Sequence, residues 1–227
     1  MEAKASKGRL KMAGAIKDKV AIIGMGCTNF EHPQRKTLSD LTVEPVYEAC
    51  EDARVDIEDI PAAWIGFIVS GSTGQSLSLP VKPLQYKHIT HVDAGYSTGL
   101  AALRLAAYGV LSKVFDIALA VGLERNTLFG WEGLPNFPVE GSCHMGLQDS
   151  FAGANVKATP AGHHSVWATK YFEKYGLNPE EGKRMLAMIS VKSHHDGALN
   201  PKAYLRQEMT LEEVLKAPII ARPLGIF

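Results

Sequence analysis

Short apolar runs alternate with helix-like segments along the first half of the chain, and this alternation limits the possible folds more than any other feature. The apolar runs cover residues 19–26, 63–69 and 116–122, with a fourth that ends at Val92. Helical spacing marks residues 38–53, where Pro45 is expected to bend the helix or split off its first turn, and residues 98–112. This order predicts an α/β fold with a mostly parallel sheet and right-handed crossovers.

The texture of the sequence changes after Glu124. Residues 125–162 are rich in Gly, Pro, Asn and Phe and show no sustained period, as in a long functional or disordered loop. Three helices are then predicted, at residues 165–175, 180–194 and 211–217. Their end signals are Gly176 as a C-cap, Pro179 at a first turn, and Thr210 with Glu213 as a capping box.

Composition narrows the classes of function. The 227 residues contain 24 Lys plus Arg and 24 Asp plus Glu, so the formal net charge is zero and a nucleic-acid binder is disfavoured. The three widely spaced cysteines suggest neither a disulfide framework nor a zinc ribbon and favour a reducing, cytoplasmic setting. No apolar run reaches the length of a membrane span. Residues 1–18 lack a signal-peptide core and are expected to form a flexible leader.

Several pairs of reactive side chains are weak candidates for a site. Cys143-His144 resembles a nucleophile and a base, but adjacent residues rarely face each other productively. His163-His164 and His194-His195 lack a spaced carboxylate that would complete a metal site, so surface or capping roles are favoured and no metal is expected. Gly24-Met25-Gly26 lacks the third glycine of a dinucleotide fingerprint. The three tryptophans, Trp64, Trp131 and Trp167, are interpreted as core or interface anchors.

Residues 92–99 read Val-Asp-Ala-Gly-Tyr-Ser-Thr-Gly between a strand and a helix. This segment resembles the nucleophile turn of the thiolase superfamily, Val-Asn-x-x-Cys-x-Ser/Thr-Gly, with Tyr96 at the position of the acylated cysteine. A cysteine before a helix N-terminus reacts as a thiolate. A phenol, whose ordinary pKa is about 10, is a poor acyl carrier at neutral pH but serves in acid–base chemistry. Tyr96 is therefore either an inert plug or an acid, base or electrophile, and Asp93 is expected to hold the turn.

The resemblance extends from about residue 19 to residue 227. Residues 20–30 look like the thiolase opening strand, residues 116–124 like the strand after the nucleophile helix, and residues 173–203 like the loop domain of the sterol-carrier-protein type. It implies a thiolase-like N-terminal α/β half over residues 19–124 and an inserted helical and irregular loop domain over 125–221. Residues 222–227 would begin a C-terminal half, which carries further catalytic groups in the family.

The resemblance implies a thiolase-like acyl-CoA acyltransferase polypeptide, of the acetyl-CoA C-acetyltransferase family, truncated or one part of a complex and inactive alone. One alternative is a retro-aldol lyase subunit acting on a steroid-like acyl-CoA, since relatives without the cysteine use tyrosines. Another is a non-catalytic acyl-CoA-binding scaffold. No permanently bound cofactor is expected, and CoA or acyl-CoA is the implied substrate. The implied partners are a second copy or a small zinc-ribbon/OB-fold protein. Candidates for a basic lining around CoA phosphates are Lys157, Lys170, Lys183, Arg184, Lys192 and Lys202.

Overall fold

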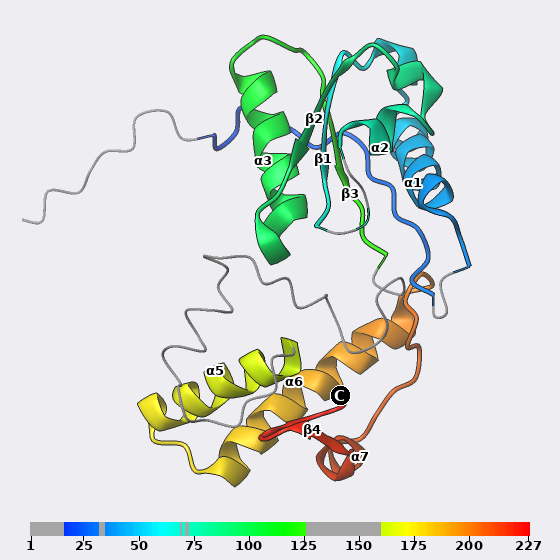
Figure 1. Cartoon of the computed structure of the whole chain (residues 1–227). Coiled ribbons are helices and arrows are strands. Elements are labelled where there is room, and N and C mark those ends of the chain that lie inside the picture. The colour runs from blue at the N-terminus through cyan, green and yellow to red at the C-terminus, as the bar shows by residue number, and fades with distance from the viewer. Residues whose placement is uncertain (1–15, 32–34, 69, 71–72, 126–159) are drawn as a thin grey trace, which may run out of the picture. The chain divides into compact units, whose positions relative to one another are not determined.

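The computed structural model of the chain describes residues 16–31, 35–68, 70, 73–125 and 160–227 (Figure 1). The chain divides into two compact units. The first comprises residues 1–26 and 42–123, and the second comprises residues 27–41 and 124–227. The first-domain and loop-domain boundaries expected from the sequence remain predictions, and each unit is described by itself.

A three-stranded parallel sheet forms the centre of the first unit. Strand β1 (Ala62–Gly66) lies between β2 (His88–Val92) and β3 (Leu119–Gly122). Gly66, the last residue of β1, is in register with the last residues of the neighbouring strands, Val92 and Gly122. The carboxyl ends of the strands therefore meet at one edge of the sheet. The α/β fold and the parallel pairing predicted from the sequence are confirmed.

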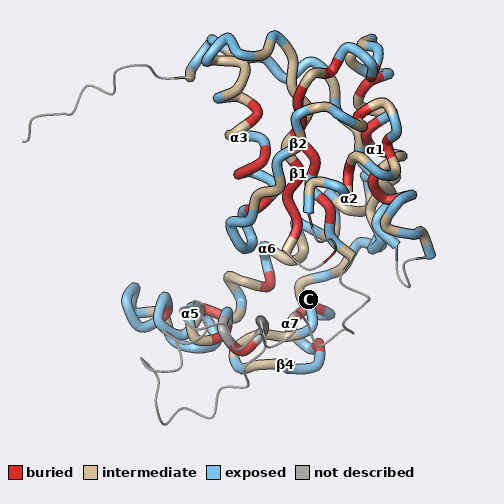
Figure 2. Tube along the Cα trace, turned by 45° about the horizontal axis from the view of Figure 1, so that its top comes forward, coloured by how far each residue is buried: buried red, intermediate tan, exposed pale blue. Residues whose placement is uncertain are grey.

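Helices lie on both sides of this sheet (Figure 1). Helix α3 (Thr98–Leu111) packs on β1 and β3, and α1 (Leu38–Ala53) and α2 (Gln75–Ser78) lie on the other side. The short 3₁₀ turns η1 (Ile57–Asp59), η2 (Lys82–Leu84) and η3 (Gly95–Ser97) connect these elements. The fully buried Ile65, Leu77 and Leu84 are among the core side chains (Figure 2). The helix at residues 38–53 is confirmed and continues through Pro45.

The sequence-based prediction of a strand at residues 19–26 is wrong. Residues 20–31 form no strand, and Ile22 and Ile23 are exposed. This segment instead runs against α1, since a Cβ atom at Gly26 would lie only 2.0 Å from the carbonyl oxygen of Pro45. The amide of Met25 donates to the side chain of Asp52 at 2.9 Å rather than to a strand. A short apolar run is also typical of a buried strand, but here Gly24 and Gly26 pack against α1 instead.

The described residues of the second unit include three helices and a small hairpin. Helix α5 (Pro160–Tyr175) begins five residues before the predicted start, α6 (Pro179–Leu199) extends five residues beyond the predicted end, and α7 (Leu211–Lys216) agrees closely. Strands β4 (Ile219–Ala221) and β5 (Leu224–Gly225) pair antiparallel.

Local signals explain where the helices of the second unit begin and end. Gly176 has a φ of +65°, which suits the glycine predicted to end α5. The predicted capping box of Thr210 and Glu213 is present at α7. A second capping box, which the sequence reading missed, opens α6 through Asn178 and Glu181. The aromatic ring of Phe172 in α5 packs against Gly182 in α6, where a Cβ atom would lie 2.4 Å from the ring.

Some features that were named from the sequence lie outside the residues that the structure describes. These are the first fifteen residues of the expected leader, most of the irregular region after Glu124, Trp131, Cys143-His144, Lys157 and the side chain of His163.

Candidate functional site

The turn singled out in the sequence lies at the carboxyl edge of the parallel sheet. It follows the last residue of β2, Val92, and leads through η3 into α3. Ligands of open α/β sheets bind at this edge, where loops rather than strands supply side chains. The turn is therefore placed where such folds hold their binding and catalytic groups.

Asp93 and Thr98 fix the shape of this turn. The carboxylate of Asp93 accepts the backbone amide of Gly95 at 2.9 Å, and Gly95 has a φ of +56°, a conformation that favours glycine. The hydroxyl of Thr98 accepts the amide of Ala94 at 2.8 Å and donates to the carbonyl of Gly95 at 2.6 Å. Thr98 is buried, whereas Asp93 is exposed. The structural role predicted for Asp93 agrees with these hydrogen bonds.

Two glycines at the strand ends allow α3 to approach the sheet closely. A Cβ atom at Gly66 would lie 2.7 Å from the Cγ2 atom of Thr98 and 2.8 Å from its carbonyl oxygen. At Gly122 the Cβ position would lie 3.7 Å from the Cα atom of Gly99, an ordinary van der Waals contact. The first turn of α3 is thus held directly over the ends of β1 and β3.

Tyr96 lies at the centre of η3, with 63% of its surface exposed. The adjacent Ser97 donates its hydroxyl hydrogen to the carbonyl of Ala94 at 2.9 Å, and its side chain does not cap α3. A group at this position faces the positive end of the dipole of α3. Tyr96 precedes the first residue of α3, Thr98, by two positions, so its backbone lies beside the N-terminus of this helix.

His91 is a further side chain near the same edge, which the sequence reading did not single out. Its ring stacks on Phe67 with centroids 3.9 Å apart, and Nε2 lies 3.1 Å from the carbonyl oxygen of Phe67. Phe67 follows the last residue of β1, so this pair joins the ends of two neighbouring strands. The signal available in the sequence was a histidine at the end of an apolar run.

The basic candidates for CoA phosphates differ in their partners. Lys170 pairs with Glu173 at 2.7 Å, and Lys192 pairs with Asp196. In each pair the hydrogen bond from the lysine lowers the pKa of the carboxyl group below its ordinary value. For Glu173, the positive charge of Lys170 is the second cause. Lys183 donates to the carbonyl of Leu215 at 2.8 Å, and Lys202 donates to the carbonyl of Cys27. The side chain of Arg184 is exposed.

Both histidines of the pair on α6, His194 and His195, contact oxygen atoms of this chain. Nδ1 of His194 lies 3.2 Å from the carbonyl oxygen of Gln207, and Nδ1 of His195 lies 2.8 Å from the carboxylate of Glu208. Across the described ranges, no cluster of three or more His, Cys, Asp and Glu side chains is placed to hold a metal ion.

The remaining cysteine and tryptophan candidates differ in how far their side chains are buried. Cys27 is exposed, while Cys50 is buried. Burial raises the pKa of the Cys50 thiol above its ordinary value, and the negative charge of Asp56 raises it further. Trp64 packs edge-on against Phe115 with centroids 6.1 Å apart, as expected for a core anchor. Trp167 is 51% exposed, so it is not a core residue, and its interpretation as an interface anchor stays a prediction. Among the helices that the structure describes, none has the length and apolarity needed to cross a membrane.

Comparison with known proteins identifies several relatives, although no family model matches the chain. An acetyl-CoA acetyltransferase of Methanocaldococcus jannaschii is 31% identical, over 91% of this chain and 51% of the relative. A 17-hydroxy-3-oxo-4-pregnene-20-carboxyl-CoA lyase of Mycobacterium tuberculosis is 24% identical, over 93% of this chain and 54% of the relative. The chain therefore spans about half the length of these relatives.

A solved structure, the Ltp2-ChsH2(DUF35) aldolase, shares the fold with a TM-score of 0.69. It is 21% identical in sequence, and the match covers 91% of this chain and 50% of the other. The sequence similarity, the shared fold and the Val92–Gly99 turn before α3 agree with one another. The chain belongs to the thiolase superfamily.

Proposed function

We propose that this chain is a thiolase-like acyl-CoA acyltransferase polypeptide of the acetyl-CoA C-acetyltransferase type, and that its 227 residues do not complete acyl transfer alone. The substrate class is CoA or an acyl-CoA, with no permanently bound cofactor. The observation that carries the proposal is the turn around Tyr96 at the carboxyl edge of the sheet, before the N-terminus of α3. The acetyltransferase relatives support the substrate class.

The side chain at residue 96 decides which step of acyl transfer this chain does not perform. In cysteine-based acyl transfer, a thiolate attacks the thioester carbonyl, an acyl–sulfur bond forms, and the CoA thiolate leaves with its electron pair. A tyrosine side chain lacks the nucleophilic sulfur on which this acyl transfer depends. Tyr96 therefore does not carry the acyl group, although the turn that would hold an acyl carrier is preserved.

Binding of the CoA phosphates is proposed to involve Lys183 and Arg184 on α6. Lys170 and Lys192 are each neutralised by a carboxylate, whereas Lys183 donates to the uncharged carbonyl of Leu215. The exposed Arg184 is adjacent to Lys183 in the sequence. Two cations without carboxylate partners attract a polyanionic nucleotide better than neutralised lysines do.

A partner protein is part of the proposal. The similar solved structure is named as an Ltp2-ChsH2(DUF35) aldolase, so a second protein takes part in that assembly. We propose that this chain assembles as a homodimer or as a hetero-oligomer, with a small zinc-ribbon/OB-fold protein as the candidate partner. The exposed apolar residues of α3, Leu100 and Leu103, support an association surface on the first unit.

A second candidate function is retro-aldol cleavage of a β-hydroxyacyl-CoA. The lyase relative and the exposed Tyr96 favour it. In that reaction a base removes the proton of the β-hydroxyl group, the bond between the α and β carbons breaks, and the thioester enolate is protonated at the α carbon. A phenol at the positive end of α3 suits proton transfer and does not require a thiolate.

Two measurements on the chain test the proposal. Calorimetry with CoA at low salt should show saturable binding that weakens when Lys183→Met and Arg184→Met are combined. Intact-mass analysis after incubation with acetyl-CoA should show no acetyl group on Tyr96. Absence of CoA binding up to millimolar concentration would contradict the substrate class, and a stoichiometric acetyl adduct at Tyr96 would contradict the assigned loss of acyl transfer.

The lyase candidate is distinguished by its product. A 3-hydroxyacyl-CoA is incubated with the chain, and the released aldehyde or ketone is trapped with a hydrazine. Carbonyl product that disappears in Tyr96→Phe would favour the lyase over the acyltransferase. CoA binding without any carbonyl product would exclude the lyase and would leave the acyltransferase polypeptide and the non-catalytic scaffold.

A further inference from the structure

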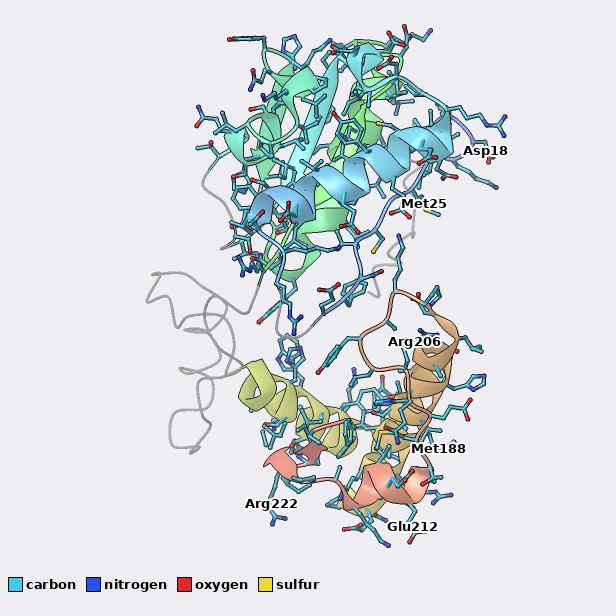
Figure 3. All side chains as sticks on the ribbon, turned by 90° about the vertical axis from the view of Figure 1, so that its right-hand side faces the viewer. Asp18, Met25, Met188, Arg206, Glu212 and Arg222 are labelled. Atoms are coloured by element: carbon cyan, nitrogen blue, oxygen red, sulfur yellow. The ribbon has the colours of Figure 1, made fainter. Side chains whose placement is uncertain are left out.

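A groove of about 520 Å³ runs along α6 in the second unit. One wall is a single face of the helix, formed by residues at positions i, i+3, i+4 and i+7, and the other is the segment that leads into α7. The lining residues are Met188, Val191, Lys192 and His195 from α6, with Glu208, Met209 and Leu211 from the segment. Figure 3 labels Met188 on α6 and Glu212 on α7, the two helices between which this segment runs.

The floor of the groove is apolar and adaptable. Met188, Val191, Met209 and Leu211 contribute hydrocarbon and thioether groups, and Met188 is 57% exposed. Methionine side chains are flexible and polarisable, so they adjust to ligands of different shape. Pockets for small molecules typically have volumes of about 300–1,000 Å³ and mostly apolar linings. The groove has the size and the surface of such a pocket.

The polar side chains that line the groove already have partners. His195 and Glu208 join the two walls through a 2.8 Å contact between Nδ1 and Oε1, and Lys192 pairs with Asp196 one turn along α6. An ionised ligand would have to displace one of these pairs or leave its own charge unpaired against apolar side chains, which costs free energy. The charge balance of the rim therefore favours an uncharged ligand.

We propose that this groove binds an uncharged, mainly apolar molecule, a chain or ring that carries one hydrogen-bonding group. The apolar part lies on Met188, Val191 and Met209, and the polar end meets the His195–Glu208 pair. The proposal concerns the second unit alone and does not depend on the role of Tyr96.

Methyl NMR of the full chain labelled with ¹³C-methyl methionine tests the proposal, with 1-octanol as the uncharged probe and octanoate as its charged match. We expect 1-octanol to shift the methyl signals of Met188 and Met209 saturably and to leave that of Met25 unchanged. Met25 is an internal control because it is 72% exposed in the other unit. Octanoate at neutral pH should bind at least about tenfold more weakly, since its carboxylate finds no free cation in the groove.

Two tryptophan variants locate the site. Val191→Trp fills the groove and should abolish the 1-octanol shifts, whereas Ile189→Trp adds the same ring at a neighbouring exposed position of α6 that does not line the groove. Two results with the unmodified chain would overturn the proposal. One is an equal shift of the Met25, Met188 and Met209 signals, and the other is no shift up to saturation with 1-octanol. Equal affinity for octanoate and 1-octanol would overturn the argument from charge.

Discussion

The carboxylate of Asp93 accepts the backbone amide of Gly95 at 2.9 Å, and this hydrogen bond holds the left-handed residue that turns the chain immediately before Tyr96. The bond is local in sequence, but it sets the position of the most informative side chain of the molecule. The superfamily pattern has asparagine where this chain has Asp93, and both side chains offer an oxygen acceptor.

Replacement of Asp93 separates its geometric role from its charge. Asp93→Asn keeps the acceptor and should leave the free energy of unfolding nearly unchanged. Asp93→Ala removes the acceptor and should lower the free energy of unfolding by about 0.5–1.5 kcal/mol. Urea unfolding followed by circular dichroism measures both variants. Equal losses in the two would show that the charge of Asp93, and not its hydrogen bond to Gly95, stabilises the turn.

Glycine 66 is predicted to be intolerant of any side chain. In Gly66→Ala the new methyl group meets Thr98 at 2.7 Å and 2.8 Å, partly against backbone, so α3 must move. We expect a loss of about 1–3 kcal/mol in the free energy of unfolding. Gly99→Ala is the matched control, because nothing lies within 4 Å of its Cβ position and alanine is the better helix former. Its thermal midpoint should be unchanged or raised; a loss equal to that of Gly66→Ala would contradict the close packing.

Cysteine at position 96 should be unusually reactive. In Tyr96→Cys the thiol lies before the N-terminus of α3, where the helix dipole lowers thiol pKa values. Iodoacetamide at neutral pH should alkylate this cysteine before the buried Cys50 and faster than the exposed Cys27. Peptide mass spectrometry of timed samples measures the three rates. A rate at residue 96 equal to that at Cys27 would argue against an activating environment in the turn.

Low pH should destabilise α7, because its capping box depends on the ionised carboxylate of Glu213. Hydrogen bonds from the backbone and then the side chain of Thr210 lower the pKa of Glu213 in the folded state. A carboxyl pKa lowered by folding stabilises the fold above its ordinary value of about 4.5, and this contribution is lost as the pH falls through the lowered value. The protection of the α7 amides from hydrogen exchange, measured relative to the intrinsic rate at each pH, should therefore decrease below that pH. Glu213→Gln should remove most of the pH dependence, whereas Glu212→Gln, which affects only an exposed pair with Lys216, should preserve it.

Self-association is expected of the isolated chain. Leu100 is 70% exposed on α3, and Leu103 is 39% exposed on the same helix. Apolar side chains grouped on a surface favour association. Light scattering at micromolar concentration should give a mass above the 24.6 kDa of one chain. Leu100→Ser should reduce that mass more than Leu79→Ser, a change at another exposed leucine; a monodisperse monomer would contradict the expectation.

Local signals in the sequence predicted many of the elements correctly. The helices at residues 38–53 and 98–112 were predicted because their apolar residues repeat with helical spacing, and Thr210 and Glu213 marked the start of α7. The capping box of Asn178 and Glu181 uses the same chemistry and was overlooked. The strand expected at residues 19–26 was wrong because a short apolar run is ambiguous in sequence, and the packing of Gly24 and Gly26 on α1 joins residues far apart in the chain.

The sequence by itself determined the superfamily, the parallel α/β sheet, and the presence of a tyrosine where a nucleophilic cysteine is expected, because these depend on residue types and their local order. Only the tertiary structure decided that Gly66 lies under Thr98, that His91 stacks on Phe67, and that α6 and the segment before α7 enclose an apolar groove. These contacts join residues far apart in the sequence. Their geometry depends on how strands and helices pack, since the spacing of residues along the chain does not encode distances between separate elements.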